Sequence, residues 1–91
     1  MARRITAEDV RDVAFDRPAI GQRGYLASEV DQFLDRVEAT LAGTTAEPLT
    51  AADVHAAAFG AAGRFRDRGY SMDQVDAFLE LVSETLDGPR D

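Results

Sequence analysis

The sequence contains one unit twice. Residues 5–43 begin ITAEDV and continue to RGY and VDQFL, and residues 49–88 begin LTAADV and continue to RGY and VDAFL. The early identities are 44 positions apart and the later ones 45, so one residue was inserted between two matching blocks. This pattern predicts two packed elements per repeat, joined by a tolerant loop, with residues 44–48 linking the repeats. A duplicated unit favours a binding or scaffolding module, because an enzyme rarely needs its active site twice in 91 residues.

Length and composition narrow the class of protein. A repeat of about 40 residues is near the lower limit for independent folding, so the repeats must bury their apolar faces together or the chain must oligomerise. The absence of cysteine excludes disulfides, thiolate metal sites and thiol catalysis. A net charge of −7, from 17 acids and 10 bases, disfavours nucleic-acid binding. We expect neither a secretory signal nor a membrane-spanning helix, and a cytoplasmic location.

A helix-start signal opens each repeat. Thr6 and Asp9 have the spacing of a capping box, and Ile5 and Val10 have that of a hydrophobic staple. The second repeat has the same device, in Leu49, Thr50, Asp53 and Val54. The signals predict short helices at about 7–15 and 51–59, each ending near a phenylalanine, with Val10, Ala14, Val54 and Ala58 facing inward.

The second helix of each repeat carries the strongest periodicity. Apolar residues recur at i, i+3, i+4, i+7 and i+11, which is one stripe of an α-helix about 14 residues and ~21 Å long. The ten stripe residues are Val30, Phe33, Leu34, Val37, Leu41, Val75, Phe78, Leu79, Val82 and Leu86. The expected architecture is all-α: two tandem helix–loop–helix units whose long helices pair as a coiled-coil-like pseudo-dimer.

The ends of the long helices have weaker signals. Ser71 and Gln74 form a capping box in the second repeat, whereas Leu26 holds the matching cap position in the first, so Ser28 is expected to cap there. Gly43 and Gly88 stand where helix C-cap glycines belong. A six-residue connection returns along a ~21 Å helix only if nearly extended, at about 3.3–3.6 Å per residue. Domain-swapped and four-helix dimers therefore stay open.

Several recurring residues have structural interpretations. Phe15, Tyr25 and their counterparts are expected in the core. Asp31 and Asp76 lie in the first turn of a helix, where a carboxylate interacts favourably with the helix dipole. His55 is expected at the surface. No nucleophile–base pair or metal-ligand cluster is visible, so no enzyme, cofactor, metal or small-molecule substrate is expected.

Taken in order, the motifs resemble the N-terminal domain of DivIVA, a bacterial cell-division and polar-growth scaffold. They are an Ile/Leu-Thr-x-x-Asp-Val start, a Phe, a short loop, Arg-Gly-Tyr and Val-Asp-x-Phe-Leu, and residues 9–41 are close to the actinobacterial form. The resemblance implies a lipid-binding module in which second helices form parallel dimers and the loops cross at a tip. An apolar residue and nearby basic residues of that tip contact the membrane, with a preference for negatively curved regions.

Carried onto this chain, the resemblance implies a membrane-binding loop in each repeat. Its residues are Arg17, Ile20 and Arg23 in the first loop, and Arg64, Phe65, Arg66 and Arg68 in the second. Two departures stand out. Gln22 and Asp67 precede the Arg-Gly-Tyr motif where one branch of the family has Phe, and the long coiled coil that follows the domain in family members is missing.

We therefore expect a non-enzymatic, membrane-associated adaptor of cell division or polar growth, peripheral to the inner face of the membrane. Its expected partners are an anionic membrane surface and either itself or a DivIVA-type scaffold. The alternative is a purely protein-binding module that pairs with a full-length DivIVA-type scaffold through the stripe, without lipid contact. A DNA-binding helix–turn–helix ranks third, because the acidic charge opposes it.

Overall fold

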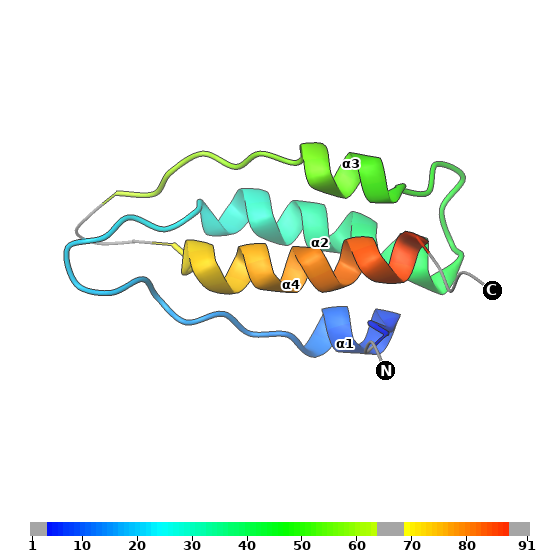
Figure 1. Ribbon diagram of the computed structural model, residues 1–91, viewed down its shortest axis with the longest axis horizontal. Helices are drawn as coiled ribbons and strands as arrows, with labels where there is room; N and C mark the ends of the chain where they lie inside the picture. The colour runs from blue at the N-terminus through cyan, green and yellow to red at the C-terminus, as the bar shows by residue number, and fades with distance from the viewer. Residues whose placement is uncertain (1–3, 64–68, 88–91) are drawn as a thin grey trace.

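A computed structural model describes residues 4–63 and 69–87 of the chain. These residues form four helices and no β-strand, which confirms the all-α class: α1 Ala7–Asp12, α2 Ala27–Ala42, α3 Ala51–Ala56 and α4 Met72–Asp87. The two long helices run in the same direction (Figure 1), from the end that carries the loops toward the end that carries the termini. The molecule measures 45 × 29 × 23 Å along its principal axes.

The capping boxes predicted for the two short helices both form. Thr6 Oγ1 accepts from the Asp9 amide at 3.1 Å, and the Asp9 carboxylate accepts from the Thr6 amide at 3.0 Å. Thr50 and Asp53 form the same pair at 3.1 and 2.9 Å. At the other end of α2, Gly43 has φ 72°, a left-handed conformation that glycine adopts without steric cost, and its N–H reaches the last carbonyls of the helix. The Gly88 prediction lies outside the described residues.

The short helices are shorter than predicted. α1 ends at Asp12 and α3 at Ala56, and their C-cap residues Val13 and Ala57 are extended, with ψ 140° and 137°. The placement of Ala14 and Ala58 on an inner helical face was therefore wrong, since both are exposed. The extended backbone instead directs Phe15 and Phe59 away from their own short helices, to rings of the other repeat.

The start of α2 also differs from the prediction. The helix begins at Ala27 with Leu26 as N-cap and no side-chain cap, so the expected role of Ser28 was wrong. The cause lies in the other repeat: the Leu26 N–H donates to the Gly60 carbonyl at 2.8 Å, which fixes the backbone at the helix start. At α4, Ser71 Oγ accepts from the Gln74 amide at 3.4 Å, while the Gln74 side chain turns to Asp16 instead of completing the capping box.

The connection between the repeats does not return along the long helix. Residues 43–50 turn at the end of α2, and α3 begins at that same end of the molecule (Figure 1). The return is made by α3 and the extended segment that follows it, just as α1 and its extended segment precede α2. The extended six-residue connection expected from the sequence was wrong, because the short helix and its following segment supply the reach.

The stripe residues of both long helices form one core. Val30, Leu34, Val37, Val75, Leu79 and Val82 are buried, the four valines completely. The other four, Phe33, Leu41, Phe78 and Leu86, are partly buried against them. Among the helices, the most extensive contacts are nevertheless those of α1 with α2 and of α3 with α4. The coiled-coil-like pairing of α2 with α4 therefore stays a prediction.

Candidate functional site: the crossing of the repeats and the loop tip

The two repeats cross at their tyrosines. Tyr25 and Tyr70 form an antiparallel bridge, in which the Tyr25 N–H donates to the Tyr70 carbonyl at 2.9 Å and the reverse bond measures 3.0 Å. Beside it, the Ala62 N–H donates to the Gly24 carbonyl at 2.7 Å. The equivalent position in the first repeat is Pro18, which has no N–H to donate. The crossing is thus nearly, but not fully, symmetric.

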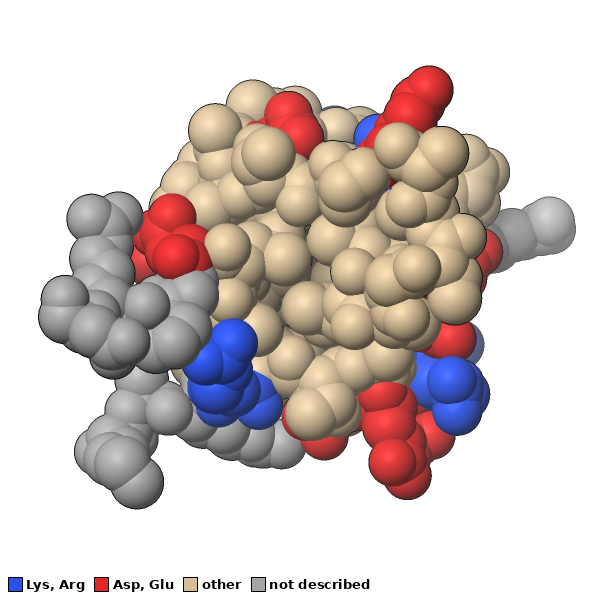
Figure 2. Space-filling model, turned by 90° about the vertical axis from the view of Figure 1, so that its right-hand side faces the viewer, with Lys and Arg blue, Asp and Glu red and all other residues tan. Residues whose placement is uncertain are grey.

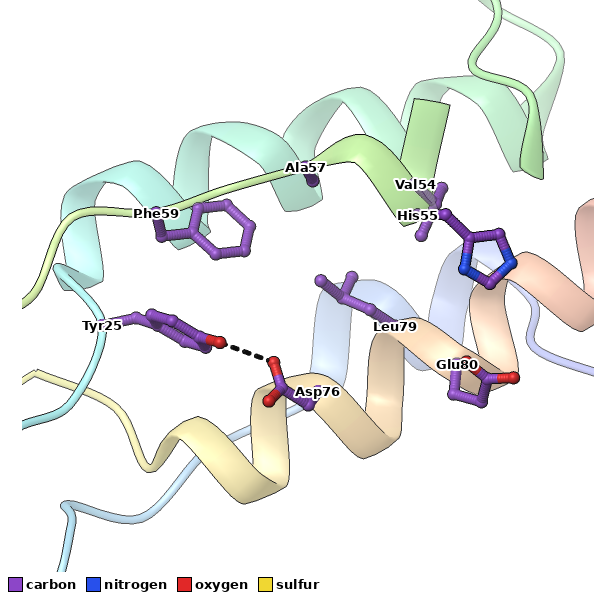
Figure 3. A pocket seen from close by; sticks show the side chains of 8 residues that line it. All are labelled: Tyr25, Val54, His55, Ala57, Phe59, Asp76, Leu79 and Glu80. Carbon is purple, nitrogen blue, oxygen red and sulfur yellow. Dashed lines mark hydrogen bonds between the residues drawn. The ribbon is translucent and has the colours of Figure 1, made fainter. Parts of the chain in front are cut away.

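Each tyrosine also reaches the long helix of the other repeat. The Tyr25 hydroxyl donates to Asp76 at 2.7 Å (Figure 3), and the Tyr70 hydroxyl donates to Asp31 at 2.8 Å. The hydrogen bond to Asp76 raises the pKa of Tyr25 above its ordinary value of 10.0, with burial and the nearby carboxylate charges adding to the effect. Only a favourable interaction with the helix dipole was predicted for the two aspartates. The repeated Tyr-to-Asp spacing was the one signal of their pairing, and it does not reveal that the partner lies in the other repeat.

The aromatic side chains also pack against the other repeat. The Phe15 ring lies 5.4 Å from that of Tyr70 and 5.8 Å from that of Phe78, measured between centroids. Phe59 is placed identically, 5.3 Å from Tyr25 and 5.7 Å from Phe33. Tilted and edge-on rings at these distances are a favourable arrangement. Each aromatic cluster therefore contains residues of both repeats.

Reciprocal hydrogen bonds between the repeats also form at the opposite end of the molecule. The Ile5 N–H donates to Thr85 Oγ1 at 2.8 Å, and the Leu49 N–H donates to Thr40 Oγ1 at 3.0 Å. In each case the residue before a short helix is held by the last turns of the long helix of the other repeat. Reciprocal contacts thus span the molecule from the crossing to the far end.

The first loop forms the tip of the molecule. Ile20 is 94% exposed, and Arg17 and Arg23 on either side of it are exposed too. A turn shapes this loop: the Gln22 N–H donates to the Ala19 carbonyl at 2.9 Å, and Gly21 has φ 87°. All three candidate residues of the first loop are therefore at the surface. The candidates of the second loop, Arg64, Phe65, Arg66 and Arg68, lie outside the described residues.

The opposite end has a different character. Figure 2 shows this end as a broad face of residues without charge, with acidic and basic side chains around its rim. Among the described residues, no group of three or more His, Cys, Asp or Glu side chains is arranged to hold a metal ion. Within the same part of the chain, no helix is long and apolar enough to cross a bilayer.

One shallow pocket lies beside the crossing. It has a volume of about 180 Å³ and contains the hydrogen-bonded Tyr25 and Asp76, with Phe59 and the exposed His55 at its margin (Figure 3). Its counterpart in the first repeat holds an ion pair instead, between Arg11 and Glu38 at 3.2 Å. The surface position predicted for His55 is confirmed.

The fold and these contacts define an all-α module of two intertwined helix–loop–helix repeats. Thirty-four residues, 37% of the chain, are 59% identical to the cell wall synthesis protein Wag31 of Mycobacterium tuberculosis, and equally identical to Wag31 of Mycobacterium leprae and of Mycolicibacterium smegmatis. The match covers only 12 to 13% of those proteins. It supports a DivIVA-like relationship for this part of the chain. No family model and no solved structure matches the chain.

Proposed function

We propose that the protein is a non-enzymatic adaptor or scaffold of bacterial cell division or polar growth, attached peripherally to the inner face of the membrane. Two independent observations support this proposal. Part of the sequence is similar to proteins named for cell wall synthesis. In addition, the first loop presents a large apolar side chain to solvent between two arginines.

The exposure of Ile20 carries the proposal. Only one other large apolar side chain of the described residues, Leu26, is exposed, and it is 37% exposed against 94% for Ile20. Transfer of an isoleucine from water into an apolar layer contributes at most ~2–3 kcal/mol. Each arginine near an anionic leaflet adds about 1 kcal/mol. Arg17, Ile20 and Arg23 together therefore support weak, reversible attachment, comparable to a single lipid anchor.

The second loop is expected from its sequence to strengthen this attachment. Phe65, with Arg64, Arg66 and Arg68 around it, has the same combination of an apolar side chain and cations. Two loops carried on one body gain avidity, because the second contact is intramolecular once the first has formed. The net charge of −7 opposes attachment, so the protein must orient most of its acidic residues away from the lipid.

Flotation with vesicles tests the proposal. The protein is mixed with anionic liposomes at low and physiological salt, beside neutral liposomes. We expect salt-sensitive binding to anionic vesicles, and loss of that binding in Ile20→Asp combined with Phe65→Asp. The matched control combines Ala46→Asp with Ala52→Asp, two exposed positions in the linker and at the start of α3, which add the same two negative charges but should retain binding. Unchanged flotation of the loop variant would contradict membrane contact through these loops.

The alternative function, pairing of the stripe with a separate scaffold, requires the molecule to open. Val30, Val37, Val75 and Val82 are completely buried within the closed chain, so a partner helix reaches them only by displacing one repeat. No described contact favours that displacement. Loss of binding to a DivIVA-type scaffold in Phe78→Asp, with that binding retained in Ile20→Asp combined with Phe65→Asp, would nevertheless establish it.

A further inference from the structure

One of the polar contacts between the two repeats is made by different residues on the two sides of the molecule. On one side, the Asp16 N–H donates to Gln74 Oε1 at 2.7 Å, and Gln74 Nε2 donates to Asp16 Oδ2 at 2.9 Å. On the other side, the Gly60 N–H donates to Glu29 Oε1 at 2.7 Å. Gly60 is the counterpart of Asp16, and Glu29 is the counterpart of Gln74. The first side thus pairs a carboxylate with an amide, and the second pairs a carboxylate with a glycine.

On each side, the residue of the long helix is chemically complementary to the residue of the extended segment that it faces. A Cβ at Gly60 would lie 3.5 and 3.7 Å from the two carboxylate oxygens of Glu29. An aspartate there would place a second negative charge beside Glu29, whereas glycine offers only its N–H. Opposite Asp16 the helix instead carries Gln74, whose amide is able both to accept from the backbone and to donate to the carboxylate. Each long helix therefore suits the extended segment of the other repeat.

Consider the first repeat paired with a copy of itself. Asp16 would then face Glu29, and the two-fold relation would create this contact twice. The donor supplied by Gln74 would be missing, and like charges at hydrogen-bond distance repel each other. The first repeat would also lose the bond from Ala62 to the Gly24 carbonyl, since Pro18 has no N–H to replace it. The second repeat paired with itself has no such conflict, because Gln74 would face Gly60.

We propose that Asp16, Glu29, Gly60 and Gln74 are specificity-determining residues, which make the first repeat select a second repeat as its partner and reject a copy of itself. The selected partner is the second repeat of the same chain in the closed form. A side-by-side dimer of two chains that pairs first repeat with first repeat is disfavoured. By the same chemistry, the second repeat accepts a related unit that carries glutamate at the position of Glu29, and the first repeat does not. The inference is independent of membrane contact.

Substitutions in the full chain reproduce the rejected contact. Gly60→Asp gives the second repeat the residue of the first and faces Glu29. Gly60→Asn is its matched control, because it has the same Cβ and the same contact with Leu26 Cδ1, which lies 2.9 Å from the added atom, but no charge. We expect a lower urea midpoint for Gly60→Asp than for Gly60→Asn at low salt, and a narrower difference at 1 M salt, where repulsion is screened.

A second substitution avoids steric change altogether. Gln74→Glu places a carboxylate opposite Asp16, and we expect a lower urea midpoint that Asp16→Asn restores. Gln32→Glu is the control for added charge on an exposed position of a long helix and should shift the midpoint less. Equal midpoints for Gly60→Asp and Gly60→Asn at low salt would overturn the proposal. The proposal would also be overturned if Gln74→Glu lowered the urea midpoint by the same amount with Asp16 present and in the Asp16→Asn background. The two residues would then not be coupled.

Discussion

The Tyr25 hydroxyl donates a 2.7 Å hydrogen bond to the Asp76 carboxylate, which belongs to the other repeat. The Tyr70 hydroxyl returns the same bond to Asp31 at 2.8 Å. We expect Tyr25→Phe and Tyr70→Phe each to lower the free energy of unfolding by about 1 kcal/mol, since each removes one partly exposed hydrogen bond to a charged group. Urea denaturation measures this. In Tyr25→Phe combined with Asp76→Asn, the losses should not add; simple additivity would show that the bond contributes nothing.

The same bond predicts the response to alkaline pH. The pKa of Tyr25 is raised above 10.0 in the folded protein, mainly by its hydrogen bond to Asp76. A group whose pKa is raised on folding contributes stability that is complete below its unfolded pKa and is lost as the pH rises through the folded pKa. The unfolding free energy should therefore fall above about pH 10. The fall should be smaller in Tyr25→Phe. An identical alkaline profile for this variant would contradict the assignment.

Alanine substitutions at three glycines should lower the stability by graded amounts. At Gly69, with φ 75°, an added Cβ would collide with the Tyr25 carbonyl oxygen at the crossing, so we expect Gly69→Ala to cost more than about 2 kcal/mol. Gly21 has φ 87° but open space around it, so Gly21→Ala should cost about 1–2 kcal/mol from backbone conformation alone. Gly63 has neither constraint and serves as the control. Thermal or urea unfolding gives the order; a neutral Gly69→Ala would show that the crossing is not close-packed.

A substitution at Phe15 tests how far the folding of one repeat depends on the other. Phe15→Ala removes ring contacts with Tyr70 and Phe78, both in the second repeat. We expect a loss of about 3 kcal/mol, at the low end for a phenylalanine because the ring is only partly buried. Circular dichroism should show α2 and α4 melting in one transition in this variant, as in the unchanged protein. Separate transitions for the two repeats would contradict the exchanged packing.

Local signals in the sequence predicted local structure well. Thr6 and Asp9 are three residues apart, so their reciprocal bonds depend on little beyond one helical turn, and the same holds for Gly43 at the end of α2. The stripe from Val30 to Leu41 also predicted burial correctly, because its period fixes one face of the helix.

The wrong predictions of helix boundaries have a common cause. The end of α1 at Asp12 and the start of α2 at Ala27 are both set by contacts with the other repeat, through Phe15 and Leu26. Phe15 contacts Tyr70, 55 positions further along the chain, and Leu26 bonds to Gly60, 34 positions further along. No local pattern specifies such partners. The exposure of Ile20 confirms that the predicted loop is at the surface, while its contact with lipid stays a prediction.

The exchanged packing has a consequence for synthesis on the ribosome. When the first repeat emerges, Phe15 and Ile5 have no complete environment, since the ring partners and the hydroxyl of Thr85 are still to be translated. Translation at about 5–20 residues per second leaves this state exposed for roughly 2–9 seconds. During that interval neighbouring nascent chains on the same message carry the same unfinished first repeats, which are the copies that Asp16 and Glu29 discourage from pairing. Repulsion between first repeats would then protect the protein before it can close.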